Sequence, residues 1–296
     1  CELSGMDVAN ASLYDGGSSV AEACSLAVSA TRNKTILISK SVNPRYSNIV
    51  ETYLKPRGIK IKYIDLLDNG KTNLSSINNL NNDIAGLVIQ SPNFFGNIED
   101  WSRVKKVMGN SKALLIGVSD PNSLSLLKPP GECGVDIYAG EGQSLGNYMS
   151  YGGPYLGLLS AKKKYLRKMP GRIIGKTVDK NNKIGFVLTL QTREQHIRRE
   201  NATSNICTNQ GLIALRACVY MSLLGKNGLP GIAKICYDKA HYTASKLYDL
   251  GNIEFPFGMD FIKEFTIKVD VSARELKKKA LEYNIFINDI KFNEDD

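Results

Sequence analysis

Short runs of Ile, Leu and Val recur along the first half of the chain and restrict the folds that it can adopt. They are TILIS (35–39), IKIKYIDL (59–66), AGLVIQ (85–90), ALLIGVSD (113–120), VDIYAG (135–140) and YLGLLSA (155–161). The first five recur at intervals of roughly 25 residues, and helix-compatible segments separate several of them. This alternation predicts an α/β fold, in which helices cover a largely parallel sheet.

The second half of the chain has a different pattern. Residues 205–225 and 228–251 each favour a helix, residues 261–271 an exposed edge strand, and residues 272–284 an amphipathic helix capped by Ser272. We therefore expect two domains. Residues 1–228 form a large α/β domain, and residues 229–296 form a smaller C-terminal α+β domain.

Charge, hydropathy and cysteine spacing limit the classes of function. Lys and Arg number 38 against 29 Asp and Glu, a net charge of +9, with the excess concentrated in residues 161–176 and 273–283. Such an excess suits an acidic partner or solvated surfaces, and no nucleic-acid module is recognisable, so we expect no nucleic-acid partner. No apolar run approaches the ~20 residues that span a bilayer, and we expect a cytoplasmic chain. The cysteines lack metal-site spacing and favour reduced thiols.

A glycine pair opens one predicted helix, in YDGGSSVAEAC (14–24). Ser19 and Glu22 match the capping-box pattern for that helix. The free N–H groups of Gly16, Gly17 and Ser18 would suit an anion, often a phosphate, because the helix dipole favours negative charge there. Plain capping is the alternative interpretation of the same residues.

Polar side chains follow two of the predicted strands. Asp120 comes just after the strand at 113–120, at the sheet edge where ligands of α/β proteins lie. It could hold a protonated pyridine nitrogen, or it could form an Asx-turn before Pro121. Asn93 and two phenylalanines follow the strand at 85–90, where the aromatic rings could stack on a planar cofactor or simply belong to the core.

The loop GEGQSLGN (140–147) lies between a predicted strand and a Gly-Gly-Pro turn, where α/β enzymes often carry a reactive side chain. Its central residue is Gln143, whose amide cannot act as an acid, a base or a nucleophile. The polar segment 189–210 surrounds His196, which could bind an anion with its neighbouring arginines or lie on the surface. No catalytic-triad, Walker or HExxH pattern occurs.

Several motifs together resemble the P-protein family of the glycine cleavage system, and within it the alpha subunits of the split bacterial form. They are CELSGMDVANASLYDG, SPNFFGNIED, LLKPPGECGVDIYAGEGQSLGNYMSYGGPYLG, MPGRIIGKTVD and GFVLTLQTREQHIRRENATSNICTNQGL, in order from residue 1 to about 231. The resemblance implies an aspartate-aminotransferase-like, fold type I pyridoxal-phosphate-dependent transferase fold. It also implies that the chain is a fragment, without the family's N-terminal segment or its last strand and helix.

The family decarboxylates glycine and passes the aminomethyl group to the lipoyl arm of H-protein. The resemblance implies that the beta subunit binds pyridoxal phosphate covalently through a lysine, and that Gln143 stands at the matching position here. An imine needs a primary amine, so we expect no catalytic residue in this chain. Asp120 matches the partner of the pyridine nitrogen. Together these imply a vestigial pocket of Gly16, Gly17, Ser18, Asn93, Asp120 and Gln143.

The implied partners are the beta subunit, lipoylated H-protein and glycine. H-proteins are commonly acidic, so the basic segment 161–176 could dock one. Two alternatives remain. One is a self-standing enzyme of the same fold that uses another lysine, such as Lys128. The other is a basic binding protein that shares only the fold.

Overall fold

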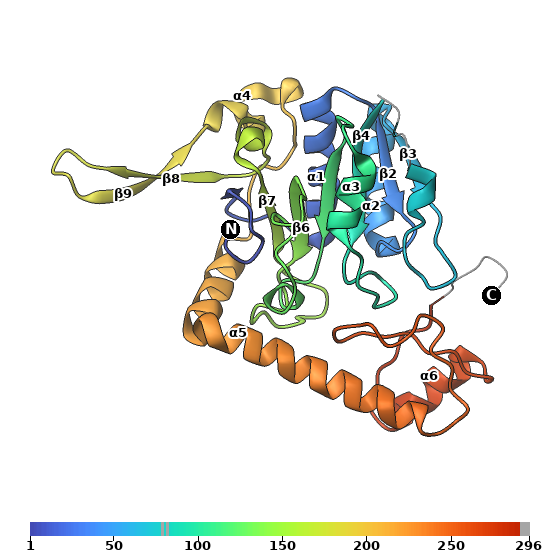
Figure 1. Ribbon diagram of the computed structural model, residues 1–296. Helices are drawn as coiled ribbons and strands as arrows, with labels where there is room; N and C mark the ends of the chain where they lie inside the picture. Colours follow the sequence, from blue (N-terminus) through green and yellow to red (C-terminus); the bar gives the residue numbers. More distant parts are fainter. Residues whose placement is uncertain (78–79, 81–82, 291–296) are drawn as a thin grey trace.

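A seven-stranded sheet forms the centre of the computed structural model, which describes residues 1–77, 80 and 83–290 (Figure 1). Its strand order is β1-β7-β6-β5-β4-β2-β3. Strands β2 to β6 are parallel, and β7 runs antiparallel to β6. The strands are β1 (Val8–Ala9), β2 (Thr35–Ser39), β3 (Lys60–Ile64), β4 (Ile84–Gln90), β5 (Leu114–Val118), β6 (Ile137–Glu141) and β7 (Gly157–Ala161). All six apolar runs predicted to be strands are confirmed.

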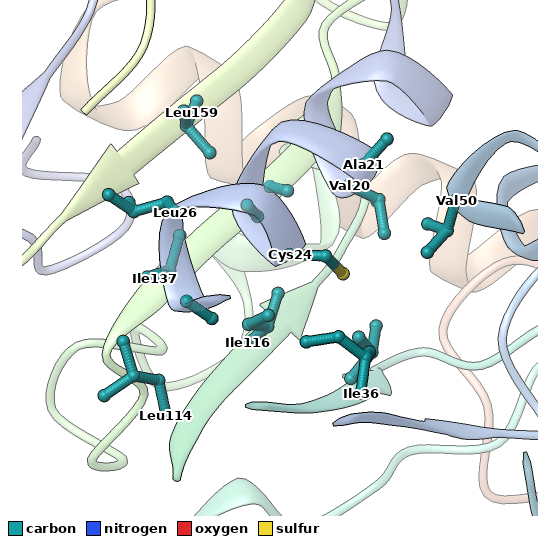
Figure 2. Packing of buried hydrophobic residues seen from close by; sticks show 14 of the residues in the cluster. Val20, Ala21, Cys24, Leu26, Ile36, Val50, Leu114, Ile116, Ile137 and Leu159 are labelled. Atoms are coloured by element: carbon teal, nitrogen blue, oxygen red, sulfur yellow. The ribbon is translucent and has the colours of Figure 1, made fainter. Parts of the chain in front are cut away.

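Helices cover both faces of this sheet because neighbouring strand residues point to opposite sides. Ile36 and Ile38 of β2 face a cluster that includes residues of α1 (Gly16–Thr31) and α2 (Pro44–Leu54). Figure 2 shows Ile36 in this cluster. Leu37 between them faces the opposite cluster, which includes α3 (Trp101–Met108). Each fully buried aliphatic side chain stabilises the fold by roughly 1.5–3 kcal/mol, so this two-sided core holds the strand ends in place.

Helix α1 begins at Gly16, three residues before the predicted capping box. The Asp15 carboxylate accepts a hydrogen bond from the Ser18 backbone N–H at 2.7 Å, and the Ser18 hydroxyl accepts one from the Asp15 N–H at 3.1 Å. The prediction that Ser19 and Glu22 form the capping box is therefore wrong. Asp15 has an extended backbone that aims its carboxylate at the first turn, and Ser19 already lies inside the helix.

The second half begins with a hairpin, β8 (Ile173–Val178) and β9 (Ile184–Thr189), which projects from the body (Figure 1). The short helix α4 (Gln195–Arg198) follows, then α5 (Gly211–Tyr248) and α6 (Ala273–Glu282). Short 3-10 helices occupy Lys55–Arg57, Leu74–Ile77, Ser123–Ser125, Lys163–Lys168, Gln191–Arg193 and Arg199–Asn201. Among the described residues, no helix is both long and apolar enough to cross a membrane.

Two predictions for this half have different outcomes. The two predicted long helices are confirmed, because α5 consists of two helical segments that meet at Gly225, whose φ is 61°. The first of them begins at residue 211 rather than 205. The predicted edge strand at 261–271 is wrong, because its residues form only isolated bridges, between Asn97 and Phe261 and between Glu254 and Lys268. Within residues 229–290, the regular secondary structure is therefore helical.

Candidate functional site

Glu141, the last residue of β6, joins the N-terminus of α1 to the loop that contains Gln143. Its Oε2 atom accepts a hydrogen bond from the Gly16 N–H at 2.8 Å. Its Oε1 atom accepts from the backbone N–H groups of Gln143 at 2.9 Å and Leu156 at 3.0 Å. Burial raises the pKa of Glu141, and these three donors partly offset that effect. Glu141 was not among the predicted site residues, yet it holds the predicted ones together.

At the predicted phosphate position, formed by Gly16, Gly17 and Ser18, carboxylates of the chain itself already accept hydrogen bonds from the helix N-terminus. Asp15 bonds the Ser18 N–H and Glu141 bonds the Gly16 N–H. The glycines have a packing role, since a Cβ at Gly16 would lie 2.6 Å from the Tyr46 hydroxyl oxygen of α2. A phosphate would compete with one carboxylate and meet the charge of Asp15, so this helix end disfavours a further anion.

Asp120 follows β5 and is neutralised by a lysine from the C-terminal region. Its Oδ2 atom lies 2.9 Å from the Lys263 ammonium, and its Oδ1 atom accepts from the Ser144 hydroxyl at 2.7 Å. Burial acts to raise the pKa of Asp120, but Lys263, Ser144 and Ser123 together hold that pKa below its usual value. Burial acts to lower the pKa of Lys263, and the ion pair with Asp120 outweighs it, so that pKa is raised.

Both interpretations of Asp120 have a counterpart in its contacts. Its Oδ2 atom accepts hydrogen bonds from the Ser123 N–H at 3.2 Å and the Ser123 hydroxyl at 3.1 Å, as in a side-chain-capped turn. The same carboxylate also holds a cation, but that cation is the Lys263 ammonium. The strand-end position therefore brings a positive charge to Asp120 without any bound molecule.

Gln143 is half-buried, and its side chain points back into its own loop. Its Nε2 atom donates to the Tyr148 carbonyl oxygen at 3.4 Å, and the backbone carbonyl oxygen of Gln143 accepts from the Asn147 N–H at 3.0 Å. The next residue, Ser144, contacts Asp120. Glu141 and Ser144 thus connect Gln143 with Asp120 and with the glycine pair at the start of α1.

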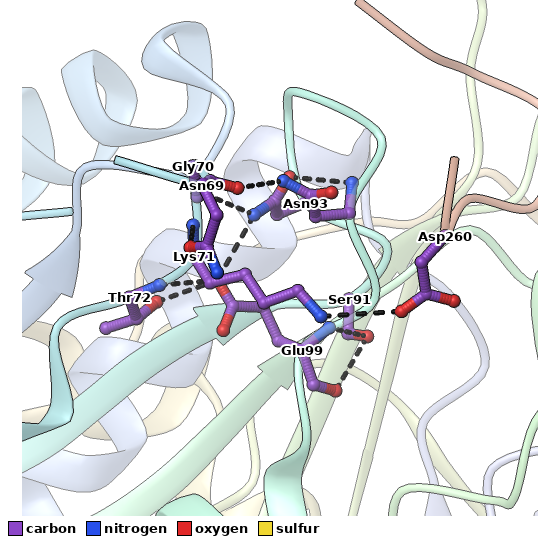
Figure 3. Close-up of polar contacts among 9 residues, drawn as sticks. Asn69, Gly70, Lys71, Thr72, Ser91, Asn93, Glu99 and Asp260 are labelled. Carbon is purple, nitrogen blue, oxygen red and sulfur yellow. Dashed lines mark hydrogen bonds and ion pairs between the residues drawn. The ribbon is translucent and has the colours of Figure 1, made fainter. Parts of the chain in front are cut away.

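Asn93 belongs to a separate, buried polar network, drawn in Figure 3. Only 1% of its surface is exposed. Its Nδ2 atom donates to the Gly70 carbonyl at 3.0 Å and to Glu99 at 3.1 Å, while its Oδ1 atom accepts from the N–H groups of Phe95 and Asn97. All four hydrogen-bonding positions of the amide are used inside the protein. Among the described residues, none of these hydrogen bonds joins Asn93 to another residue of the predicted pocket.

Lys128, His196 and one cavity are further candidates for a functional role. Lys128 is exposed, and the His196 side chain is 52% exposed, with Nδ1 lying 3.7 Å from Glu194. A cavity of about 200 Å³ is lined by residues of the N-terminal segment, β7 and α5, and by none of the six residues of the predicted vestigial pocket. Across residues 1–77, 80 and 83–290, no group of His, Cys, Asp and Glu could hold a metal ion.

The mixed seven-stranded sheet, with β7 antiparallel beside β6, matches the fold of fold type I pyridoxal-phosphate-dependent enzymes. The sphingosine-1-phosphate lyase of Burkholderia pseudomallei shares this fold at a TM-score of 0.66 and 12% identity, over 95% of this chain and 62% of that one. The chain belongs to the glycine cleavage system P-protein family, whose family model matches residues 1–296.

Two relatives define the position of the chain within that family. It is 48% identical to the probable glycine dehydrogenase (decarboxylating) subunit 1 of Chloroherpeton thalassium, over 99% of this chain and 66% of that protein. The crystal structure of glycine decarboxylase, the P-protein of the glycine cleavage system, in inhibitor-bound form superposes with a TM-score of 0.92 at 37% identity, over 96% of this chain and 64% of that chain. The chain thus spans about two thirds of these relatives' length. The name subunit 1 implies a partner subunit.

The residues of this chain do not fit pyridoxal phosphate, the cofactor of the fold class. The helix end that would receive its phosphate is bonded to Asp15 and Glu141. The carboxylate that would face its ring nitrogen is bonded to Lys263. Gln143 offers an amide, which forms no Schiff base.

Proposed function

We propose that this chain is the greater part of a glycine dehydrogenase alpha subunit that supports a cofactor site in its beta-subunit partner. The holoenzyme decarboxylates glycine and transfers the aminomethyl group to lipoylated H-protein in the cytoplasm. Pyridoxal phosphate supplies the electron sink for such a decarboxylation. We assign the cofactor and its lysine to the beta subunit. The observation that carries the proposal is that Glu141 and Lys263 satisfy the groups that would otherwise bind the cofactor.

The described lysines near the strand ends support the same division of labour. A Schiff base forms from a neutral amine. The ion pair with Asp120 raises the pKa of Lys263 and so keeps its amine protonated, and Lys128 is exposed. These contacts give no support to a self-standing enzyme that uses another lysine.

Glycine-dependent exchange of bicarbonate tests this proposal. The full-length subunit would be assayed with H-protein and pyridoxal phosphate, with and without the beta subunit. We expect exchange only when both chains are present. Exchange by this subunit alone would overturn the proposal and direct attention to Lys263.

The basic segment 161–176 remains our proposed docking surface for H-protein, and its contacts favour Lys163 as the residue to change. Lys162 and Lys164 lie 4.0 Å and 3.6 Å from Asp136, a carboxylate that Lys105 also contacts at 2.7 Å. Removing them would disturb a buried anion, because the Asp136 side chain is only 3% exposed. Lys163 is exposed and avoids that complication.

Neutralising Lys163 as Lys163→Gln should weaken H-protein affinity about threefold at low salt, and less at high salt, because a surface charge steers an acidic partner only over a Debye length. Lys62→Gln is the matched control, since Lys62 is an exposed lysine of β3 at the opposite edge of the sheet. Equal affinities for both variants would contradict the docking surface.

A further inference from the structure

The β8–β9 hairpin exposes a continuous apolar face. Directly opposed residues of an antiparallel pair lie on the same face, and the register pairs Ile174 with Leu188, Lys176 with Phe186 and Val178 with Ile184. Five large side chains therefore make up this apolar face: Ile174 (50% exposed), Val178 (56%), Ile184 (63%), Phe186 (70%) and Leu188 (43%). The described residues leave it open to solvent.

The opposite face of the hairpin carries smaller residues. It carries Gly175, Thr177, Gly185 and Val187. A ribbon whose large apolar side chains gather on one face is typical of strands that pack on that side. Because an isolated two-stranded hairpin is marginally stable in water, such a ribbon needs a cover on its apolar face.

The base of the hairpin is anchored to the body, and its turn is closed by internal hydrogen bonds. At the base, Ile173 is 7% exposed, and the Arg193 guanidinium donates to the carbonyl oxygens of Met169 and Gly171. At the tip, the Asp179 carboxylate accepts from the N–H groups of Asn181 at 2.7 Å and Lys183 at 3.0 Å. The hairpin is thus held as a projecting arm (Figure 1), and its apolar face is exposed.

The charges near the apolar face indicate which kind of surface could cover it. Lys176 lies on the face itself, and Lys180 and Lys183 lie in the turn, where Asp179 is the acidic residue and is engaged by the backbone. A cover for this arm would have an apolar groove with an acidic rim. A second copy of this chain, with its net charge of +9, would bring repulsion instead.

We infer that the apolar face of the β8–β9 arm docks into an apolar, acid-rimmed groove of the partner subunit. The inference rests on the proposed function, because that function requires a partner chain. It adds the surface through which the partner is held and the chemistry of the partner's groove. Relatives of this chain are about half as long again, so a segment of the same polypeptide is the competing occupant.

The test compares two substitutions on neighbouring residues of β9 in the full-length subunit. Phe186→Ser removes the largest side chain of the apolar face, and Val187→Ser makes a similar change on the opposite face, where Val187 is also 49% exposed. Affinity for the beta subunit would be measured by sedimentation or calorimetry. We expect Phe186→Ser to weaken association at least tenfold and Val187→Ser to change it less than twofold. Equal effects would overturn the inference.

Thiol labelling of Phe186→Cys identifies the occupant and does not depend on a large loss of affinity. The labelling rate at residue 186 should be high in the isolated full-length subunit and should fall at least tenfold when the beta subunit is added. Slow labelling in the isolated subunit would mean that its own chain, or a second copy, covers the arm. If the wild-type chains fail to associate, the proposed function falls too; if they associate and labelling stays fast, the arm alone is refuted.

Discussion

Replacing Lys263 by Met should loosen the segment around residue 263, because its ion pair with Asp120 is lost. The Lys263 ammonium lies 2.9 Å from Asp120, and the two side chains are only 28% and 25% exposed. Lys263→Met removes the cation and leaves a largely buried carboxylate without its counter-charge. The pair links residues far apart in the sequence, so the loss should appear as local opening around residue 263.

The size of the effect follows from the burial of the pair. Breaking a fully buried pair costs about 3–5 kcal/mol, whereas exposed pairs contribute about 0.2–1 kcal/mol. Because both side chains are about three-quarters buried, we place the cost of breaking this pair between those limits, at about 2 kcal/mol. Since each 1.4 kcal/mol is a factor of ten, local opening should become roughly thirtyfold more frequent.

Hydrogen exchange measured by mass spectrometry at pH 7 would detect this opening. The informative amides include the Lys268 N–H, which donates to the Glu254 carbonyl at 2.9 Å. The control is Lys268→Met, because the pair of Lys268 with Glu254 spans 3.4 Å with side chains 68% and 69% exposed. That variant should accelerate exchange less than threefold. Similar acceleration in both variants would refute the reasoning.

The pH dependence provides a second check on the same pair. The pKa of Asp120 is lowered in the folded state, so its stabilisation is present above the unfolded value of about 3.9 and is lost as the pH falls through the folded value. The pKa of Lys263 is raised, so its contribution is lost only as the pH rises above about 10.4. The stability difference between wild type and Lys263→Met should therefore fade below pH 4.

Three further predictions concern the packing of α1. Burial raises the pKa of Glu22 to about 7, so folding stability should fall as the pH rises from about 4 to 7. Glu22→Gln should remove that pH dependence and add up to about 3 kcal/mol to the stability at pH 8. A thermal-melting profile that Glu22→Gln leaves unchanged would contradict this. Gly157→Ala should destabilise by about 3 kcal/mol in urea unfolding, because its Cβ would lie 2.6 Å from the Asp15 carbonyl oxygen; a neutral effect would show that the backbone yields. Asp15→Ala should cost about 1 kcal/mol through the lost cap, measured the same way, and no loss would mean that Glu141 suffices at this helix end.

Local pattern was sufficient to predict the sheet but not the hairpin. The central strands are continuous apolar runs because helices bury both of their faces, and such runs stand out from any neighbouring sequence. Residues 173–178 and 184–189 mix glycine, lysine and threonine with isoleucine, and their alternation makes sense only once the antiparallel register is known. The segment 261–271 has an alternating pattern too, but its Phe261 stacks on His241 at 4.1 Å, a tertiary contact that outweighs strand propensity.

The candidate site shows the same limit. The positions of Gly16, Asp120 and Gln143 could be predicted from strand ends and a helix start, which are local features. Glu141 and Lys263 could not, because their roles depend on what they meet after folding. Glu141 bonds Gly16, and Lys263 bonds Asp120, in each case across more than a hundred residues of sequence. No periodicity in the sequence reports such a contact.

Borohydride reduction of the assembled holoenzyme, followed by mass analysis of each chain, tests the central claim most directly. Reduction fixes pyridoxal phosphate onto whichever lysine carries it. We expect a pyridoxyl adduct on the beta subunit and none on this chain, because Glu141 and Lys263 engage the groups that the cofactor would need. An adduct on this chain, at Lys263 or any other lysine, would contradict it.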